Sequence, residues 1–180
     1  MRWRFLSCLI LCLFAGSPVI GEDRAEQGAM RISSLAFENN GDIPSQYGCA
    51  GANVNPPLRI DGVPPGSKSL ALVFDDVDAR RGSYVHWILW NIDPKTVEIR
   101  ENSIPAGAVE GTNDFKKTAY GGPCPPTRPH TYVFRVYALD RFLDLPVTSA
   151  KKDLEKAMEG HILAKAELRG RYRKGPPSKK

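Results

Sequence analysis

L-A-L-V-F-D-D-V-D-A-R-R-G-S-Y-V-H-W-I-L-W-N-I, residues Leu70–Ile92 of this 180-residue chain, combines strand-forming and polar segments in one short stretch. Two apolar runs, Leu70–Phe74 and Tyr84–Ile92, are rich in aliphatic and aromatic residues. A loop with three aspartates, two arginines and a glycine separates these runs. This pattern predicts two buried β-strands joined by a functional loop.

The polar residues of this stretch are the first candidates for chemistry. Asp75, Asp76 and Asp78 lie in the loop, and His86 lies inside the second strand. Side chains of one parity in that strand are expected on one side of the sheet: Tyr84, His86, Ile88 and Trp90. The imidazole of His86 would then be aimed where the acidic loop can meet it. The alternatives are a histidine satisfied within the core and aspartates that only cap turns.

A second polar stretch lies much later in the chain. The sequence G-G-P-C-P-P-T-R-P-H-T-Y, Gly121–Tyr132, is too rich in Gly and Pro to be helical, and it delivers His130 at the start of another strand. If this stretch converges with the acidic loop, the two build one polar pocket.

The remaining pattern is mainly β. Further strands are expected at Met30–Phe37, Leu58–Ile60 (a short edge strand), Val97–Ile99, Thr131–Leu139 and Ala164–Tyr172. The last of these alternates small or apolar residues with charged ones, which predicts one dry and one wet face. One helix is expected at Ala150–Glu159, with Ser149 as its cap and Gly160 at its end. These elements predict an antiparallel two-sheet β-sandwich with one or two short peripheral helices.

The N-terminus resembles a secretory signal. Residues 1–21 combine two arginines, a short apolar run and small residues suited to cleavage, which predicts a secreted or periplasmic protein without stable membrane insertion. The alternative is a retained anchor. Residues 22–29 are interpreted as a flexible leader, 30–173 as a single domain and 174–180 as a basic flexible tail.

Charge and motifs exclude some classes of partner. The formal net charge is +5, and loss of residues 1–21 would remove two arginines and no acidic residue. The remaining mild positive bias favours anionic ligands slightly. The basic residues are dispersed, and the chain contains no zinc-finger, phosphate-loop or RNA-binding motif, so no nucleic acid partner is expected.

The cysteine count is also informative. Only Cys49 and Cys124 remain after signal removal, and an oxidising compartment would permit a single intramolecular pairing. The alternative is two unpaired small core residues. Neither cysteine lies in a C-x-x-C motif, so a redox role is not indicated.

Nine short motifs occur in an order typical of one family. They are N-P-P-L-R-I (55–60), G-V-P-x-G-x-K-S-L-A-L (62–72), D-x-D-A (76–79), V-H-W-I-L-W-N-I (85–92), G-x-N-D-F (111–115), Y-G-G-P-C-P-P (120–126), H-x-Y (130–132), Y-A-L-D (137–140) and A-M-x-G-H-I-L-A (157–164). With them the chain resembles the phosphatidylethanolamine-binding protein family, in its prokaryotic Raf-kinase-inhibitor-like branch. The similarity runs over nearly the whole mature chain, from about Ile32 to Tyr172.

The resemblance implies a fold and a site. It implies a β-sandwich with Greek-key connections and a small pocket for phosphate, acetate-like anions or a phosphorylated head group. Residue by residue, it implies these pocket residues: Asp76, Asp78, His86, Gly122, Pro123, His130 and Tyr132. The chain departs from the family's D-P-D-A-P and H-R-Y patterns at Val77, Arg80 and Thr131. The pocket loops are therefore expected to be less rigid, and Arg80 is expected to add a cation at the rim of the pocket.

These residues suit the binding of a small anion. Two imidazoles, a phenol and the backbone N–H groups of a Gly/Pro loop form an array of donors, and an aspartate on a histidine's second nitrogen would favour protonation. Binding should then weaken as the pH rises. We expect a non-enzymatic binding protein without a cofactor or a metal, which acts alone or by modulating a protein partner. The alternatives are an inhibitor of a kinase or protease and a hydrolase using Asp76, Asp78, His86 and His130, although H-E-x-x-H and G-x-S-x-G are absent from the sequence.

Overall fold

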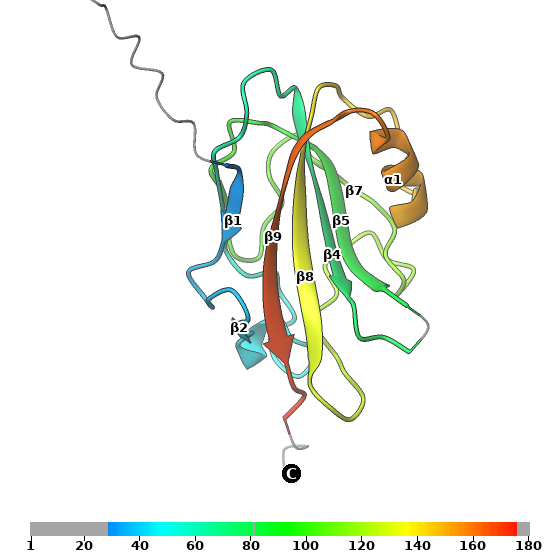
Figure 1. The fold of residues 1–180 in the computed structure, drawn as a ribbon. Helices are drawn as coiled ribbons and strands as arrows, with labels where there is room; N and C mark the ends of the chain where they lie inside the picture. Colours follow the sequence, from blue (N-terminus) through cyan, green and yellow to red (C-terminus); the bar gives the residue numbers. More distant parts are fainter. Residues whose placement is uncertain (1–28, 81, 176–180) are drawn as a thin grey trace, which may run out of the picture.

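The protein, described here from a computed structural model that places residues 29–80 and 82–175, is built mainly from β-strands. The described part contains these elements: β1 (Arg31–Ser33), β2 (Gly41–Asp42), a 3₁₀ turn η1 (Ser45–Tyr47), β3 (Leu58–Asp61), β4 (Ser69–Asp76), β5 (Tyr84–Ile92), β6 (Glu98–Ile99), β7 (Val109–Glu110), β8 (His130–Leu139), α1 (Lys151–Met158) and β9 (Ile162–Tyr172). Figure 1 shows the strands of the large sheet side by side, with α1 and β1 at opposite sides. The predicted fold class, a mostly antiparallel β-sandwich, is confirmed.

The large sheet has the strand order β2-β9-β8-β4-β5-β7, and the small sheet has the order β1-β3-β6. All pairs are antiparallel except β2 with β9. The main core lies between the two sheets, where Ile32 and Ile60 of the small sheet pack with Leu72 and Phe134 of the large one. Apolar burial between these layers provides the main stabilisation of the fold.

Helix α1 covers the other face of the large sheet. Leu154 and Met158 of the helix pack with Val73 and Trp90 in a second, smaller cluster. Figure 1 shows the helix beside β5, at the side of the large sheet away from β1. The last described strand alternates as predicted, since Ala166, Leu168, Gly170 and Tyr172 are buried between exposed or half-buried charged residues.

Several details of the sequence prediction are wrong. β4 continues to Asp76, so Asp75 and Asp76 belong to the end of this strand and not to the loop. The first strand ends at Ser33, well before Phe37, because the Ser34 hydroxyl donates to the Pro57 carbonyl and accepts from the Ala36 N–H. β3 is the central strand of the small sheet and not an edge strand. A further error concerns the cap of α1.

Ser149 does not cap α1. The helix begins at Lys151, and Asp153 accepts a hydrogen bond of 2.9 Å from the backbone N–H of Ala150. The helix ends at Met158, and Gly160 follows in the left-handed region with φ +76°. The predicted stop at Gly160 is therefore supported by its backbone conformation.

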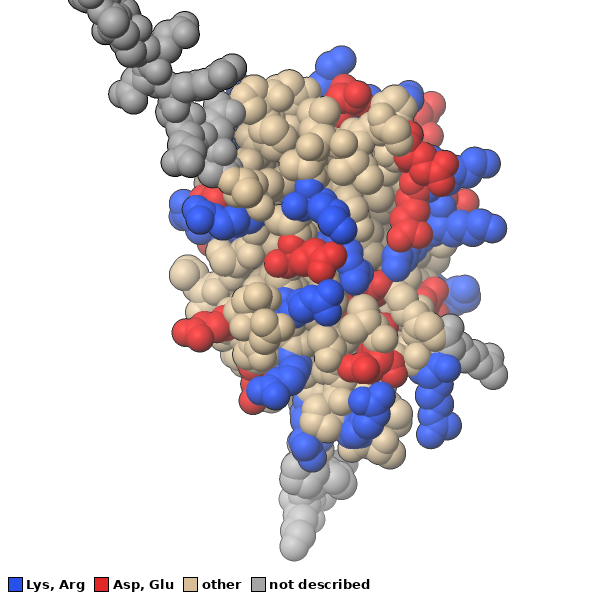
Figure 2. All heavy atoms as spheres, viewed as in Figure 1, with Lys and Arg blue, Asp and Glu red and all other residues tan. Residues whose placement is uncertain are grey.

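The predicted signal and most of the leader and tail, within residues 1–28 and 176–180, lie outside the described residues. Within the described part, no helix is both long and apolar enough to cross a membrane. On the face shown in Figure 2, acidic and basic side chains are interspersed and leave no large area of one sign. This agrees with the dispersed basic residues of the sequence.

Candidate functional site

The candidate site lies at the end of the large sheet where β8 begins and β9 ends, low in the view of Figure 1. The cross-strand register places Asp76 of β4 directly opposite Tyr132 of β8. Nδ1 of His130 lies 2.7 Å from a carboxylate oxygen of Asp76, and the two side chains are 9% and 8% exposed. The carboxylate thus fixes the orientation of this buried imidazole.

A β-bulge places His86 in the same site. Phe74 pairs with Trp87 and Asp75 pairs with Val85, so His86 is the extra residue in β5. Its ring lies 5.2 Å from the ring of Tyr132, measured between centroids. The parity prediction is therefore wrong for part of its set: His86 faces the inter-sheet side, whereas Ile88 and Trp90 belong to the cluster beneath α1.

His86 is bonded twice to the Gly-rich stretch. The backbone N–H of Gly121 donates to the carbonyl of His86 over 3.0 Å, and Nδ1 of His86 lies 2.6 Å from the carbonyl of Gly121, to which it donates. Asn113 also donates to the His86 carbonyl, over 3.2 Å. Burial lowers the pKa of His86, while the Gly121 carbonyl and the Asp76 charge act in the opposite direction. The ring is therefore largely neutral near pH 7.

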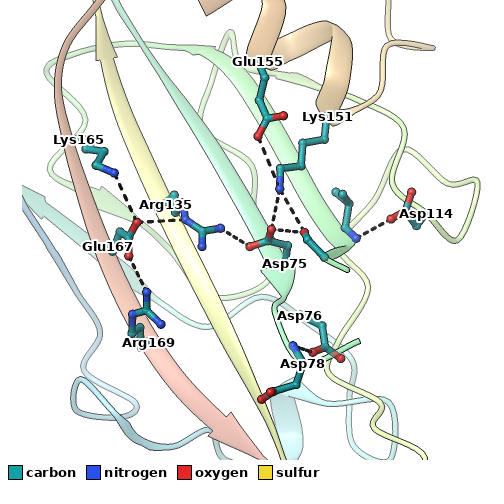
Figure 3. A network of polar contacts seen from close by, with 12 residues as sticks. Asp75, Asp76, Asp78, Asp114, Arg135, Lys151, Glu155, Lys165, Glu167 and Arg169 are labelled. Carbon is teal, nitrogen blue, oxygen red and sulfur yellow. Dashed lines mark hydrogen bonds and ion pairs between the residues drawn. The ribbon is translucent and has the colours of Figure 1, made fainter. Parts of the chain in front are cut away.

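Asp78 supports the loop and does not contact an imidazole nitrogen directly. One of its carboxylate oxygens accepts a 2.7 Å hydrogen bond from the Thr131 N–H, which lowers the pKa of Asp78. Its own N–H donates to Asp76 over 2.9 Å, as Figure 3 shows. The guanidinium of Arg128 lies 3.7 Å from the second carboxylate oxygen. Asp78 thereby connects the start of β8 to the residue that holds His130.

Gly122 and Pro123 form a tightly packed wall. The Gly122 N–H donates to the Asn53 side chain over 2.7 Å, and a Cβ on Gly122 would lie only 2.4 Å from the Tyr47 carbonyl oxygen. The Cys49 N–H donates to the carbonyl of Pro123 over 3.0 Å. Glycine is needed at 122 because there is no room for a side chain.

Cys49 and Cys124 are bonded, with their sulfur atoms 2.01 Å apart. Of the two alternatives for these cysteines, the structure contains the pairing. The disulfide fastens the irregular segment after η1 to the wall of the site. Both cysteines are exposed, and they border a hollow of about 280 Å³ that is also lined by Phe115 and Tyr120.

Tyr132 is fully buried and carries an unusual hydroxyl group. No described residue forms a hydrogen bond with its oxygen, although Asp76 and the Cys124 backbone are close to it. Burial raises the pKa of Tyr132, and the Asp76 carboxylate raises it further. The phenol therefore remains a neutral O–H donor across the physiological range.

Asp75 points away from this site. On the other side of the large sheet, its carboxylate oxygens lie 2.5 Å from Nη1 of Arg135 and 2.8 Å from Nζ of Lys151 (Figure 3). Ser83 also donates to it. Burial disfavours the charged form of Asp75, but the hydrogen bonds from Lys151 and Ser83 and the charge of Arg135 lower its pKa overall. Neighbouring aspartates thus have separate roles: Asp75 anchors the strand end and Asp76 holds His130.

Within residues 29–80 and 82–175, no three His, Cys, Asp or Glu side chains gather closely enough to form a metal site. The polar groups gathered here are instead two imidazoles, a carboxylate and a buried phenol. This set can supply both hydrogen-bond donors and acceptors to a small ligand.

Comparison with known proteins identifies the family. The model of the phosphatidylethanolamine-binding proteins matches residues 33–173. The chain belongs to the phosphatidylethanolamine-binding protein family. A UPF0098 protein of Methanothermobacter thermautotrophicus is 47% identical over 151 residues, which cover 81% of this chain and 100% of that protein.

Solved members of the phosphatidylethanolamine-binding protein family share the fold. A structure from Chlamydia trachomatis, described as a homologue of the family, is 39% identical with a TM-score of 0.79 and covers 82% of this chain and 99% of its own. Escherichia coli YbcL, described as a member of the mammalian family, is 27% identical with a TM-score of 0.77 and covers 82% of this chain and 100% of its own.

Several contributors to the site were not predicted from the sequence. Gly121 and Asn113 act through backbone contacts that no residue pattern indicates, although both lie within quoted family motifs. The Phe115 ring packs against the His86 ring, with centroids 5.1 Å apart. Tyr172 reads as the last apolar residue of an alternating strand, yet it lies directly opposite His130.

Proposed function

We propose that this member of the phosphatidylethanolamine-binding protein family is a non-enzymatic binding protein for a small anion or a phosphorylated group. The observation that carries the proposal is the meeting of His86, His130 and Tyr132 around Asp76 at one end of the large sheet. Buried groups of this kind form a fixed array with little competing water.

The protonation of the two imidazoles supports an anion in particular. Each ring uses Nδ1 for a protein partner, Gly121 in one case and Asp76 in the other. The neutral rings therefore hold their proton on Nδ1, and Nε2 donates only after a second proton is gained. A negative ligand beside the rings favours that proton, so binding should be coupled to proton uptake.

A zwitterionic head group suits the remaining charges. Asp76 and Asp78 would repel a bare anion but can meet an amine, and Arg128 at the rim is 63% exposed in its side chain. Phosphoethanolamine combines both charges, and the solved Chlamydia trachomatis relative is described as a homologue of phosphatidylethanolamine-binding proteins. We further propose export of the chain, supported by the sequence pattern of residues 1–21.

NMR of the three histidine rings tests the proposal. We expect inorganic phosphate and phosphoethanolamine to shift the resonances of His86 and His130, and His86→Ala or His130→Ala to weaken binding strongly. His161 is the matched control, because its Nδ1 lies 2.9 Å from Asp140 in a similar pair. That pair lies just beyond the far end of β8, about 30 Å away for a strand of this length.

Two results would contradict the proposal. One is the absence of shifts at millimolar ligand, and the other is a response confined to His161. Turnover of a generic phosphoester by the purified protein would instead favour the hydrolase alternative.

A further inference from the structure

Two buried tyrosines at this end of the sheet have hydroxyl groups without a partner among the described residues. They are Tyr132 on β8 and Tyr172 on β9, with exposed fractions of 0% and 2%. A buried phenol has lost its hydrogen bonds to water, so leaving it unpaired is unfavourable. An unsatisfied buried group in a native protein calls for an explanation, and a bound ion or an ordered water is one of them.

The strand register places Tyr172 within the candidate site. Residues directly opposite each other in antiparallel strands point to the same face, and Tyr172 is opposite His130. Tyr132 is opposite Asp76 in the same way. The rings of Tyr132 and Tyr172 are 6.5 Å apart between centroids and nearly perpendicular, at 87°. The two phenols and His130 therefore share one inward face at the end of the sheet.

The chain makes room for the phenol end of Tyr172 at Gly48. A Cβ on Gly48 would lie 2.1 Å from both Cζ and the hydroxyl oxygen of Tyr172. The backbone of Gly48 is extended, with φ −98°, so glycine is required here for space and not for conformation. The next residue, Cys49, is bonded to the wall of the site through Cys124. The hydroxyl of Tyr172 is thus enclosed by the segment that the disulfide fastens.

We propose that Tyr172 is a further ligand-binding residue of this site and that its hydroxyl and that of Tyr132 donate together to the bound group. This inference rests on the proposed function. Neither neutral imidazole offers a proton on Nε2, whereas a phenol offers its proton at neutral pH. The two phenols therefore select a group with at least two acceptor oxygens, such as a phosphoryl group, over a cation or a donor-only amine.

Calorimetric titration with inorganic phosphate at about pH 6, where imidazoles take up protons, tests this role. We expect Tyr172→Phe and Tyr132→Phe each to weaken phosphate binding by about tenfold, the effect of losing a hydrogen bond to a charged acceptor. Tyr137→Phe is the matched control, because Tyr137 lies on the same strand as Tyr132 but packs against the cluster beneath α1. The phosphate affinity of Tyr137→Phe should equal that of the unsubstituted protein.

Thermal unfolding separates ligand binding from a structural role. Because the hydroxyl has no described partner, ligand-free Tyr172→Phe should unfold at the same temperature as the unsubstituted protein or above it. Addition of phosphate should raise the thermal midpoint of Tyr172→Phe by less than it raises that of the unsubstituted protein. Gly48→Ala is a second variant that displaces the phenol without removing a polar group, and it should also weaken binding.

Three results would overturn the inference. Equal phosphate affinity in Tyr172→Phe and the unsubstituted protein would reject Tyr172 while leaving the proposed function intact. A lower midpoint without phosphate, together with unchanged affinity, would assign the hydroxyl to folding alone. Absence of phosphate binding in the unsubstituted protein would reject the proposed function and this inference together.

Discussion

Replacement of Asp75 by Asn tests how the strand end beside the site is held. Asp75 is 1% exposed and contacts two cations, Nη1 of Arg135 at 2.5 Å and Nζ of Lys151 at 2.8 Å. The substitution keeps the shape of the side chain and removes its charge. Arg135 would keep its 3.1 Å contact with Glu167, and Lys151 would keep its 3.6 Å contact with Glu155 and its 3.1 Å hydrogen bond to Ser83.

The expected loss of stability follows from the burial of these groups. Removal of one partner from a buried ion pair costs about 3–5 kcal/mol. The side chains of Arg135 and Lys151 are 18% and 21% exposed, so water can partly solvate them after the change. We therefore expect a loss of about 2–3 kcal/mol at neutral pH, which lowers the thermal midpoint by about 6–12 °C in a domain of this size.

The pH dependence gives this prediction a second test. The folded-state pKa of Asp75 lies below its ordinary value of 3.8, so its stabilisation is fully present above that value. It is lost as the pH falls through the folded-state pKa, because the unfolded chain then binds the proton more readily. The difference between the unsubstituted protein and Asp75→Asn should therefore shrink below about pH 3.8.

Circular dichroism melting curves from neutral to acidic pH would measure both effects. Glu155→Gln is the control, because its carboxylate is 50% exposed and should contribute less than about 1 kcal/mol. A thermal midpoint for Asp75→Asn within about 2 °C of that of the unsubstituted protein would refute the anchoring role of Asp75. A difference in midpoint between the two proteins that stays constant at acidic pH would also refute this role.

The remaining predictions concern the pocket and its wall. Gly122→Ala should abolish measurable phosphate binding in calorimetry, because the new Cβ would lie 2.4 Å from a backbone oxygen. Affinity for sulfate, whose charge is constant from weakly acidic to weakly basic pH, should fall as the pH rises, by up to about tenfold per pH unit above the lowered pKa of His86. Reduction of the Cys49–Cys124 bond, which spans 75 residues, should cost about 4 kcal/mol in denaturant unfolding. Asp76→Asn should weaken phosphate binding, because the carboxylate that fixes the orientation of the His130 ring through a 2.7 Å contact is replaced by a neutral amide.

Each of these predictions has a result that contradicts it. Unchanged phosphate affinity in Gly122→Ala would show that the wall is not part of the site. Sulfate affinity that is flat with pH would exclude proton uptake. Equal unfolding midpoints with and without reductant, checked against the Cys49→Ser/Cys124→Ser double variant, would show that the disulfide adds nothing to stability. Tighter phosphate binding by Asp76→Asn would mean that simple charge repulsion dominates at the site.

The long strands could be predicted from the sequence because their residues either form an apolar run that is buried on both faces, as in β4, or alternate between a dry and a wet environment. β9 is the best example, since its buried small and apolar residues lie between charged ones. β5 was predicted as an element, but the parity of His86 was not, because one inserted residue reverses the facing of all residues beyond it. No pattern in a strand buried on both faces reveals such a bulge.

The site could be predicted only where polar residues interrupt apolar segments or match a family motif. His86, His130 and Asp76 were found in that way, and the register brings them together. The distinct roles of Asp75, Asp76 and Asp78 were not predicted, because the sequence pattern placed all three in a loop. β4 in fact continues to Asp76, which turns Asp75 and Asp76 to opposite faces of the sheet. Tyr172 was missed because the sequence gives no sign that a buried hydroxyl lacks a partner.

The position of an anion in crystals of the protein soaked with phosphate would show most directly whether the two histidines form a binding site. We expect one phosphate within hydrogen-bonding distance of Nε2 of His86 and His130 and of the hydroxyl of Tyr132. Phosphate found only in the hollow where Arg171 and Arg173 flank Tyr172, with neither imidazole in contact with it at saturating concentration, would contradict binding by the two histidines.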